Sequence, residues 1–271
     1  MEKTNYHTHT TRCLHAEGSD EAYVQTALKQ GYTVLGFSDH SPWQYDSDYV
    51  GTMRMPATDL PGYVASVRAL QQKYAGRIEL RLGLECEYFP RYIDWLKEQV
   101  RRYQMDYLIF GNHFYPSDET GPYFGQATKT IAMLRSYVDS SIEGLESGLY
   151  TCFAHPDLFL RAWPGFDDNA RAASRELCRA AKRLQIPVEY NLLGTLYNER
   201  YHIDGYPHEG FWRIAAEEGC TAIIGVDSHA PGQLENEAGR EKGLRLLRGL
   251  GMEITDTLRY NSWEANGAAA L

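Results

Sequence analysis

The stretch Asn5-Tyr6-His7-Thr8-His9 closes the first β-rich segment of the chain, and His15 follows shortly after it. On a strand, residues i and i+2 point to the same side, about 6–7 Å apart. A strand that ends in His7-x-His9 therefore presents two imidazoles to one point in space, and imidazole is a common ligand of Zn, Fe, Mn and Ni. Two accidental histidines at a disordered terminus are the alternative, and the rest of the chain decides between them.

Apolar, β-rich segments alternate seven times with helix-like segments. This alternation is typical of parallel strands joined by crossover helices, and seven units favour a closed α/β barrel over an open sheet. We find no linker or repeat, so residues 1–271 are expected to form one domain, with a long loop at residues 191–207. The expected strands are residues 3–8, 33–39, 79–88, 107–111, 150–154, 187–190 and 220–226, and the expected helices are residues 19–30, 59–74, 90–103, 128–147, 168–184, 208–218 and 234–250.

Composition and charge disfavour several classes of protein. The net charge of −9 argues against a nucleic-acid backbone as the main partner and is compatible with a protein that holds cations. No apolar run approaches the roughly 18 residues of a membrane span, and no signal peptide is recognisable, so we expect a cytoplasmic protein. The 5 cysteines are scattered without a CxxC pair, which predicts reduced thiols, most of them in the core. The oligomeric state is left open.

Most of the histidines lie where the predicted strands end. In a parallel barrel all the carboxyl ends of strands meet on one face, where active sites form. One metal ion takes about four protein ligands, and more donors than that converge here, enough for two or three ions. The converging residues are His7, His9, His15, His40, Glu85, His113, His155, Asp227 and His229.

Single members of this set have simpler interpretations. His113 or His155, taken alone, is more often a core histidine that donates to a backbone carbonyl, and only the convergence favours the metal hypothesis. His202 and His208 lie in a polar loop and at a helix start, so they stay outside the set.

Three further carboxylates adjoin the set. Asp39 and Asp157 stand beside His40 and His155 and are expected to orient their neighbours. Glu87 shares a strand face with Glu85, so it is expected to be either a ligand or an acceptor behind the ligands.

In sequence order these residues resemble the motif set of the PHP (polymerase and histidinol phosphatase) family. The likeness covers nearly the whole chain and implies a distorted seven-stranded (β/α) barrel, similar to a TIM barrel, with a trinuclear centre of divalent Zn, Fe or Mn ions. The matching motifs are His7-x-His9 with His15, Asp39-His40, Gly83-x-Glu85, Gly111-Asn112-His113, Ala154-His155-Pro156 and Asp227-x-His229.

The resemblance also implies roles for individual residues. Glu85 would bridge the first two ions, and Glu85, Asp227 and His229 would serve catalysis. The implied ligand groups are His7, His9, Glu85 and Asp227 for the first ion; Glu85, His113 and His155 for the second; and His15, His40 and His229 for the third.

Within the family, the length and the Met53-Arg54-Met55 loop look most like the stand-alone histidinol-phosphate phosphatases. These features imply hydrolysis of L-histidinol phosphate, with a hydroxide that bridges two ions as the nucleophile and an arginine fork on the phosphate. Arg161 and Arg200, on loops after the fifth and sixth strands, are the expected phosphate ligands. Arg12 and Arg54 are weaker candidates.

Two departures from the family pattern bear on the substrate: Asn112 before His113, and the stretch Asn191-Leu192-Leu193-Gly194-Thr195. The alternatives are therefore a phosphoesterase that acts on a nucleotide or another small phosphate ester, and a metal-binding module without catalysis. The second alternative would require missing ligands, and the expected ligand set is complete.

Overall fold

The computed structural model describes residues 1–260, and its centre is a parallel sheet. Eight strands of this described part follow one another in chain order across the sheet, so the predicted α/β barrel is confirmed with one short strand more than expected. The strands are β1 (Thr4–Asn5), β2 (Val34–Phe37), β3 (Glu79–Cys86), β4 (Tyr107–Phe110), β5 (Cys152–Phe153), β6 (Val188–Asn191), β7 (Thr221–Gly225) and β8 (Glu253–Ile254).

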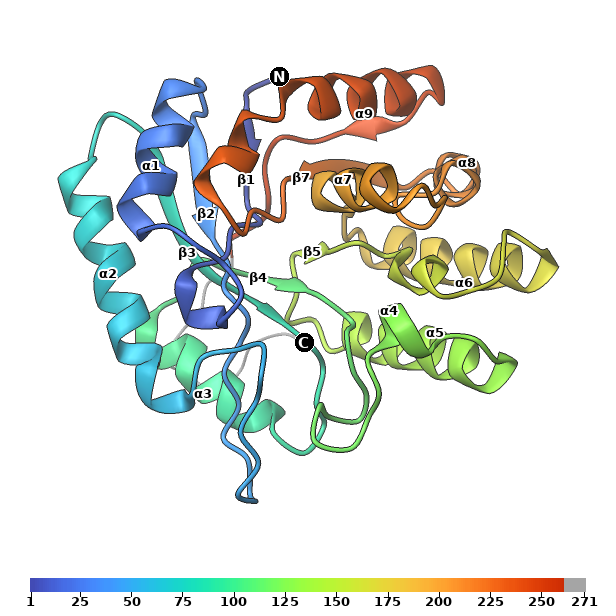
Figure 1. The fold of residues 1–271 in the computed structure, drawn as a ribbon, viewed down its shortest axis with the longest axis horizontal. Coiled ribbons are helices and arrows are strands. Elements are labelled where there is room, and N and C mark those ends of the chain that lie inside the picture. Colours follow the sequence, from blue (N-terminus) through green and yellow to red (C-terminus); the bar gives the residue numbers. More distant parts are fainter. Residues whose placement is uncertain (261–271) are drawn as a thin grey trace.

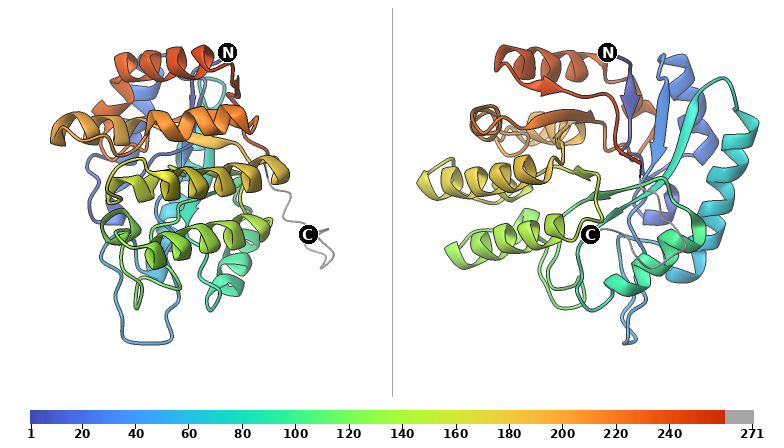
Figure 2. Two further views of the ribbon diagram at one scale, coloured as in Figure 1. Left: turned by 90° about the vertical axis from the view of Figure 1, so that its right-hand side faces the viewer. Right: turned by 180° about the vertical axis from the view of Figure 1, so that it is seen from behind.

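The helices cover the outer side of this curved sheet (Figure 1 and Figure 2). The predicted span 168–184 is confirmed as α6: Asp167 accepts a hydrogen bond from the Ala170 amide at its start, and Gln185 ends it in the left-handed conformation. The helices are α1 (Asp20–Lys29), α2 (Leu60–Lys73), α3 (Ile93–Tyr103), α4 (Phe124–Ala127), α5 (Ile131–Glu146), α6 (Asp168–Leu184), α7 (Leu192–Tyr201), α8 (Glu209–Glu217) and α9 (Glu237–Gly249).

The long loop predicted for residues 191–207 is wrong, because most of it is helix α7. Asn191 caps this helix by accepting a hydrogen bond from the Gly194 amide at 2.8 Å. Asparagine followed by a glycine-containing segment suggests a turn, but the same side chain is also a good helix cap. Arg200 therefore lies on the last turn of a helix and not on a loop.

The first and last strands meet without a continuous backbone ladder. Thr8 and Ser228 form an isolated parallel bridge beyond β1 and β7. At the opposite end, the Thr4 hydroxyl donates to the Asp256 carbonyl at 2.7 Å. These contacts bring β1 beside β7 and the segment after β8, so the curved sheet encloses an interior.

Apolar side chains pack in two separate places. The larger core lies between the sheet and the helices, and a smaller cluster that includes Tyr6, Tyr107 and Ile109 fills the interior of the barrel. The Tyr107 hydroxyl donates to the Tyr6 carbonyl at 2.7 Å. All 5 cysteines are buried and free, as expected for reduced thiols. None of the helices among residues 1–260 has the length and apolar character that a membrane span requires.

Gly83→Ala is expected to destabilise the protein by about 1–3 kcal/mol, the usual cost of overpacking a filled core. A Cβ at Gly83 would lie 2.6 Å from a ring carbon of Tyr107 and 2.7 Å from its carbonyl oxygen. The control is Gly62→Ala on α2, which has open space around it and should stabilise the helix by about 0.5–1 kcal/mol. Urea unfolding of both variants measures the difference, and changes of the same sign would contradict this account of the core.

Candidate metal centre

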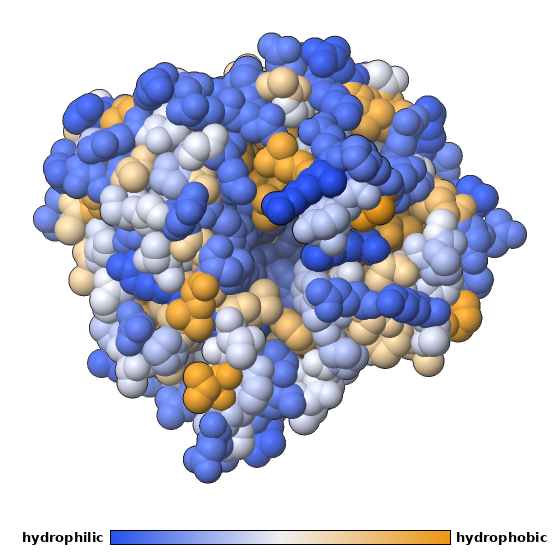
Figure 3. Space-filling view, viewed as in Figure 1, coloured by the Kyte–Doolittle hydropathy of each residue, from blue (hydrophilic) through white to orange (hydrophobic). Residues whose placement is uncertain are grey.

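The nine predicted ligands come together at the carboxyl ends of the strands, around a cavity of about 440 Å³. Figure 3 shows this cavity as a hollow near the middle of the face. His7 and His9 are fully buried beneath its floor, whereas His15 lies at the exposed rim. Seven of the nine line the wall: His15, His40, Glu85, His113, His155, Asp227 and His229.

The first donor group has the spacing of a tetrahedral site. The Nε2 atoms of His7 and His9 lie 3.1 Å apart, and Glu85 Oε2 lies 3.4 Å from each of them. Asp227 Oδ1 lies 3.3 Å from His7 Nε2 and 3.1 Å from His9 Nε2. Donors about 2.0–2.1 Å from a tetrahedral Zn²⁺ are about 3.3–3.4 Å from one another, so these separations match one shared cation.

Glu85 faces two donor groups with its two carboxylate oxygens. Oε2 faces His7 and His9, while Oε1 lies 2.8 Å from His155 Nε2 and 3.4 Å from His113 Nε2. A carboxylate in this position can bridge two cations, as the resemblance implied.

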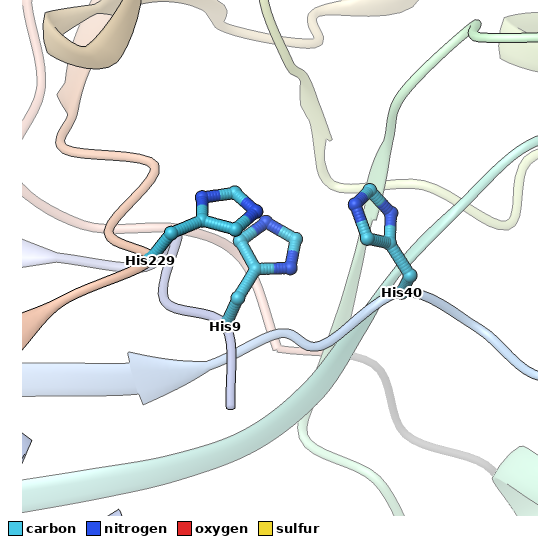
Figure 4. A group of neighbouring side chains, drawn as sticks. All are labelled: His9, His40 and His229. Atoms are coloured by element: carbon cyan, nitrogen blue, oxygen red, sulfur yellow. The ribbon is translucent and has the colours of Figure 1, made fainter. Parts of the chain in front are cut away.

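The third predicted ligand group, His15, His40 and His229, lies directly beside the first. His15 Nε2 lies 2.9 Å from His229 Nε2, and His40 groups with His9 and His229. Figure 4 shows the rings of His9 and His229 face to face, with His40 opposite them, and the first two ring centres are 4.0 Å apart. The donors therefore form one connected cluster.

Hydrogen bonds behind the cluster determine which nitrogen of each ring faces inward. The His15 ring donates through Nδ1 to the Cys13 carbonyl at 2.7 Å, and the His229 ring donates through Nδ1 to the Asp227 carbonyl at 3.1 Å. Carbonyl oxygens only accept, so the Nε2 atoms of His15 and His229 direct lone pairs at each other. Two facing lone pairs at 2.9 Å repel unless a cation or a proton lies between them.

The charges of the cluster also favour a cation. Burial raises the pKa of Glu85, but the surrounding imidazoles, led by His113, lower it well below its usual value. Burial lowers the pKa of His7, but the carboxylates around it, led by Asp227, raise it well above its usual value. At the outer end, burial and then His9 lower the pKa of His229 to about 3. Ionised carboxylates thus stand beside the neutral imidazole of His229.

The kinds of donor in the cluster indicate which cations it would hold. Histidine nitrogens and carboxylate oxygens make up the first donor group. The mixture of imidazole and carboxylate donors suits Zn, Fe or Mn, so the residues present fit the divalent cations that the family resemblance implies.

His155 and Asp227 both adopt backbone conformations that residues other than glycine rarely adopt, with φ of 30° and 55°. Strained conformations of this kind persist only where the surrounding structure holds them, and they gather at functional sites. Here they turn the chain at the ends of β5 and β7 so that both side chains meet the cluster.

Arg54 does not line the cavity. The prediction that it is one of the weaker candidates for binding the phosphate is therefore wrong. Its guanidinium is buried and donates to both oxygens of Glu87, at 3.0 and 2.8 Å, and to Asp118 at 2.9 Å. Glu87 in turn accepts from His113 Nδ1 at 3.1 Å. Burial raises the pKa of Glu87, but Arg54 and His113 lower it to about 2. Of the two roles expected for Glu87, its contacts therefore fit that of the hydrogen-bond acceptor behind a predicted ligand, His113.

The other predicted residues divide between the cavity and its surroundings. Arg161 and Arg200 line the cavity, whereas Arg12 pairs with Asp20 outside it, at 2.8 Å. Asp157 accepts from the His208 amide at 2.8 Å and so holds the start of α8.

Sequence reasoning missed Glu189, which is buried and accepts from His7 Nδ1 at 2.8 Å. The available signal was one carboxylate in the otherwise apolar run Ile186-Pro187-Val188-Glu189-Tyr190. An acid inside a buried strand needs a partner, and the predicted histidines were the nearest candidates.

Arg54→Met is expected to lower the free energy of unfolding by about 3–5 kcal/mol, because it leaves the buried Glu87 carboxylate without its cation. The matched control is Arg91→Met, which breaks an exposed pair with Asp46 and should cost about 0–1 kcal/mol. Denaturant unfolding of both variants makes the comparison. Similar losses in the two would contradict a special role for the buried pair.

Two proteins named as probable histidinol-phosphatases are similar to this chain over most of its length. A probable histidinol-phosphatase from Deinococcus radiodurans is 31% identical over 235 residues, which span 84% of this chain and 86% of that protein. A probable histidinol-phosphatase from Schizosaccharomyces pombe is 24% identical over 247 residues, which span 84% of this chain and 81% of that protein.

The same fold occurs in the crystal structure of the histidinol phosphate phosphatase from Lactococcus lactis, complexed with Zn, L-histidinol and phosphate. The TM-score is 0.73 at 19% sequence identity, over 96% of this chain and 99% of that chain. A sequence model of the PHP domain matches residues 5–192, which is more than half of the chain. On this evidence the chain belongs to the PHP domain family.

Proposed function

We propose that this protein is a metal-dependent phosphomonoesterase that hydrolyses L-histidinol phosphate to L-histidinol and phosphate. The observation that carries the proposal is the donor cluster at the floor of the cavity, in which His7, His9, Glu85 and Asp227 have the mutual spacing of ligands to one cation. The names of the D. radiodurans and S. pombe relatives support the choice of substrate.

Three divalent cations, Zn, Fe or Mn, would be held by the three overlapping groups around Glu85. When bound, such cations neutralise phosphate oxygens and make a water nucleophilic near neutral pH. The protein contributes by keeping the donors in place. Asn191 donates to Asp227 Oδ2 at 3.1 Å, which leaves Oδ1 facing the histidines. His229 keeps Nε2 directed at the cluster by donating through Nδ1.

Arg161 is the better placed of the two arginines to hold the phosphate. Its guanidinium donates to the Tyr197 hydroxyl at 2.9 Å and to the Tyr123 hydroxyl at 3.3 Å, and it lies 4.0 Å from the centre of the Tyr197 ring. A half-buried, oriented guanidinium loses little freedom when it binds an anion and offers a planar fork that matches phosphate oxygens. Arg200 is exposed at the mouth of the cavity, where it would meet the phosphate or guide its entry.

The outer half of the cavity would receive the histidinol moiety. Among the described residues that line it, Glu85 and Asp227 are the only carboxylates, and both belong to the metal cluster. The amine and imidazole of the substrate would therefore meet aromatic faces and neutral polar groups, since tyrosine rings attract cations. These residues are Tyr123, Tyr197, Tyr201, Tyr206 and Gln233.

Protein purified without chelator is expected to hold roughly two to three equivalents of divalent metal, because nine donors exceed the set of about four that one ion takes. Glu85→Gln should remove the most metal, since Glu85 faces two groups, whereas His40→Asn should remove about one equivalent. Elemental analysis after gel filtration measures the content. Wild-type protein with less than one equivalent, and no activity restored by added metal, would contradict the proposed function.

Arg161→Ala is expected to lower kcat/KM for histidinol phosphate by about ten- to a thousandfold, at about 1.4 kcal/mol per power of ten, without loss of metal. Arg161→Lys tests the fork, because it keeps the charge but not the planar geometry. Arg213→Ala, an exposed arginine on α8 paired with Glu209, is the control and should leave the rate unchanged.

The substrate itself is tested by assaying histidinol phosphate beside nucleotide and sugar phosphates with the same wild-type preparation. Histidinol phosphate should have the highest kcat/KM of the panel. A nucleotide or generic ester that is hydrolysed tenfold better would overturn the substrate assignment and leave the phosphatase assignment intact.

A further inference from the structure

Glu189 on β6 lies directly behind the donor cluster, and its contacts reach two donor groups. Its Oε1 accepts from His7 Nδ1 at 2.8 Å, and its Oε2 accepts from the His155 backbone amide at 3.1 Å. The Asn191 amide group donates to the same Oε2 at 2.9 Å and to Asp227 Oδ2 at 3.1 Å. One buried carboxylate thus contacts the segments that follow β1 and β5 directly, and it reaches Asp227, after β7, through Asn191.

The contact with His7 determines how that ring can act. A carboxylate oxygen only accepts hydrogen bonds, so His7 donates through Nδ1, and its Nε2 is turned toward His9, Glu85 and Asp227. The contact with His155 is through the backbone, at a residue with φ of 30°. Its effect is to hold a strained turn that aims His155 Nε2 at Glu85 Oε1, 2.8 Å away.

The Glu189 carboxylate occupies space that a side chain on the neighbouring strand would otherwise fill. Gly225 on β7 pairs with Asn191, two residues beyond Glu189 on the neighbouring strand. A Cβ at Gly225 would lie 1.7 Å from Glu189 Oε1, so any larger residue there must displace the carboxylate. Gly225 therefore belongs to the same arrangement as Glu189.

Glu87 provides a contrast within the same site. It also accepts from the Nδ1 of a ligand histidine, His113, but its side chain meets only that one ring of the cluster and the guanidinium of Arg54 balances its charge. The polar partners of Glu189 in the described part of the chain are a histidine ring, an amide side chain and a backbone amide. Glu189 thus touches two donor groups, whereas Glu87 touches one.

We propose that Glu189 is a positioning residue that couples the first and second cation sites, because it orients His7 of the first group through its side chain and His155 of the second through its backbone. The proposal rests on the proposed metal centre. Carboxylates behind metal-bound histidines commonly contribute about 10- to 100-fold to metal affinity. Glu189 should contribute at two sites, and Glu87 at one.

The test measures stepwise binding of Zn²⁺ by competition with a chromophoric chelator, for wild type, Glu189→Gln and Glu87→Gln. Glu189→Gln should weaken two of the bound cations by about 10- to 100-fold each, and Glu87→Gln should weaken one. Excess Zn²⁺ should restore most of the activity of Glu189→Gln, which damage to the fold would not allow. Glu189→Gln that binds as wild type does, or that weakens only one cation, would overturn the proposal.

Gly225→Ala is the second variant in case Glu189→Gln does not fold. It keeps the carboxylate but displaces it, so the same two cations should bind more weakly, and unchanged binding would count against the proposal. Wild-type protein that binds no Zn²⁺ would instead contradict the proposed function, which distinguishes the two failures.

Discussion

The structure depends on a confined space in which buried carboxylate oxygens and imidazole nitrogens face one another. Glu85 and Asp227 are buried, and the Nε2 atoms of His7 and His9 lie within 3.4 Å of both. Buried groups with this polarity repel one another or lose hydration without compensation. Divalent cations between these donors would remove both costs. The arrangement therefore fits a metal site.

The barrel separates this polar layer from an apolar one. Deeper in the interior, Tyr6, Tyr107 and Ile109 pack together, and the Tyr107 hydroxyl donates to the Tyr6 carbonyl. This lower apolar layer lies beneath the strand ends that the ligands follow. Behind the ligands, Glu87 accepts from the His113 ring and from Arg54, while Glu189 accepts from the His7 ring and from Asn191.

The walls of the cavity differ in chemistry from its floor. Helix α7 begins directly after β6 and supplies Leu193, Leu196 and Tyr197 to the lining, while the 3-10 helix after β5, Leu158–Arg161, supplies Arg161. Tyr197 both lines the cavity and accepts from Arg161. The floor would hold the cations, and the walls would contact the organic part of the substrate under the proposed function.

The sequence by itself determined the alternation of parallel strands with helices and the residues expected to converge at the strand ends. Parallel strands end on one face, and i and i+2 share a side of a strand, so His7, His9 and His155 could be brought together without coordinates. Only the tertiary structure decided that Arg54 is buried against Glu87, that residues 192–201 form a helix, and that Glu189 lies behind two ligands. These features depend on which distant segments pack together, and local sequence patterns do not contain that information.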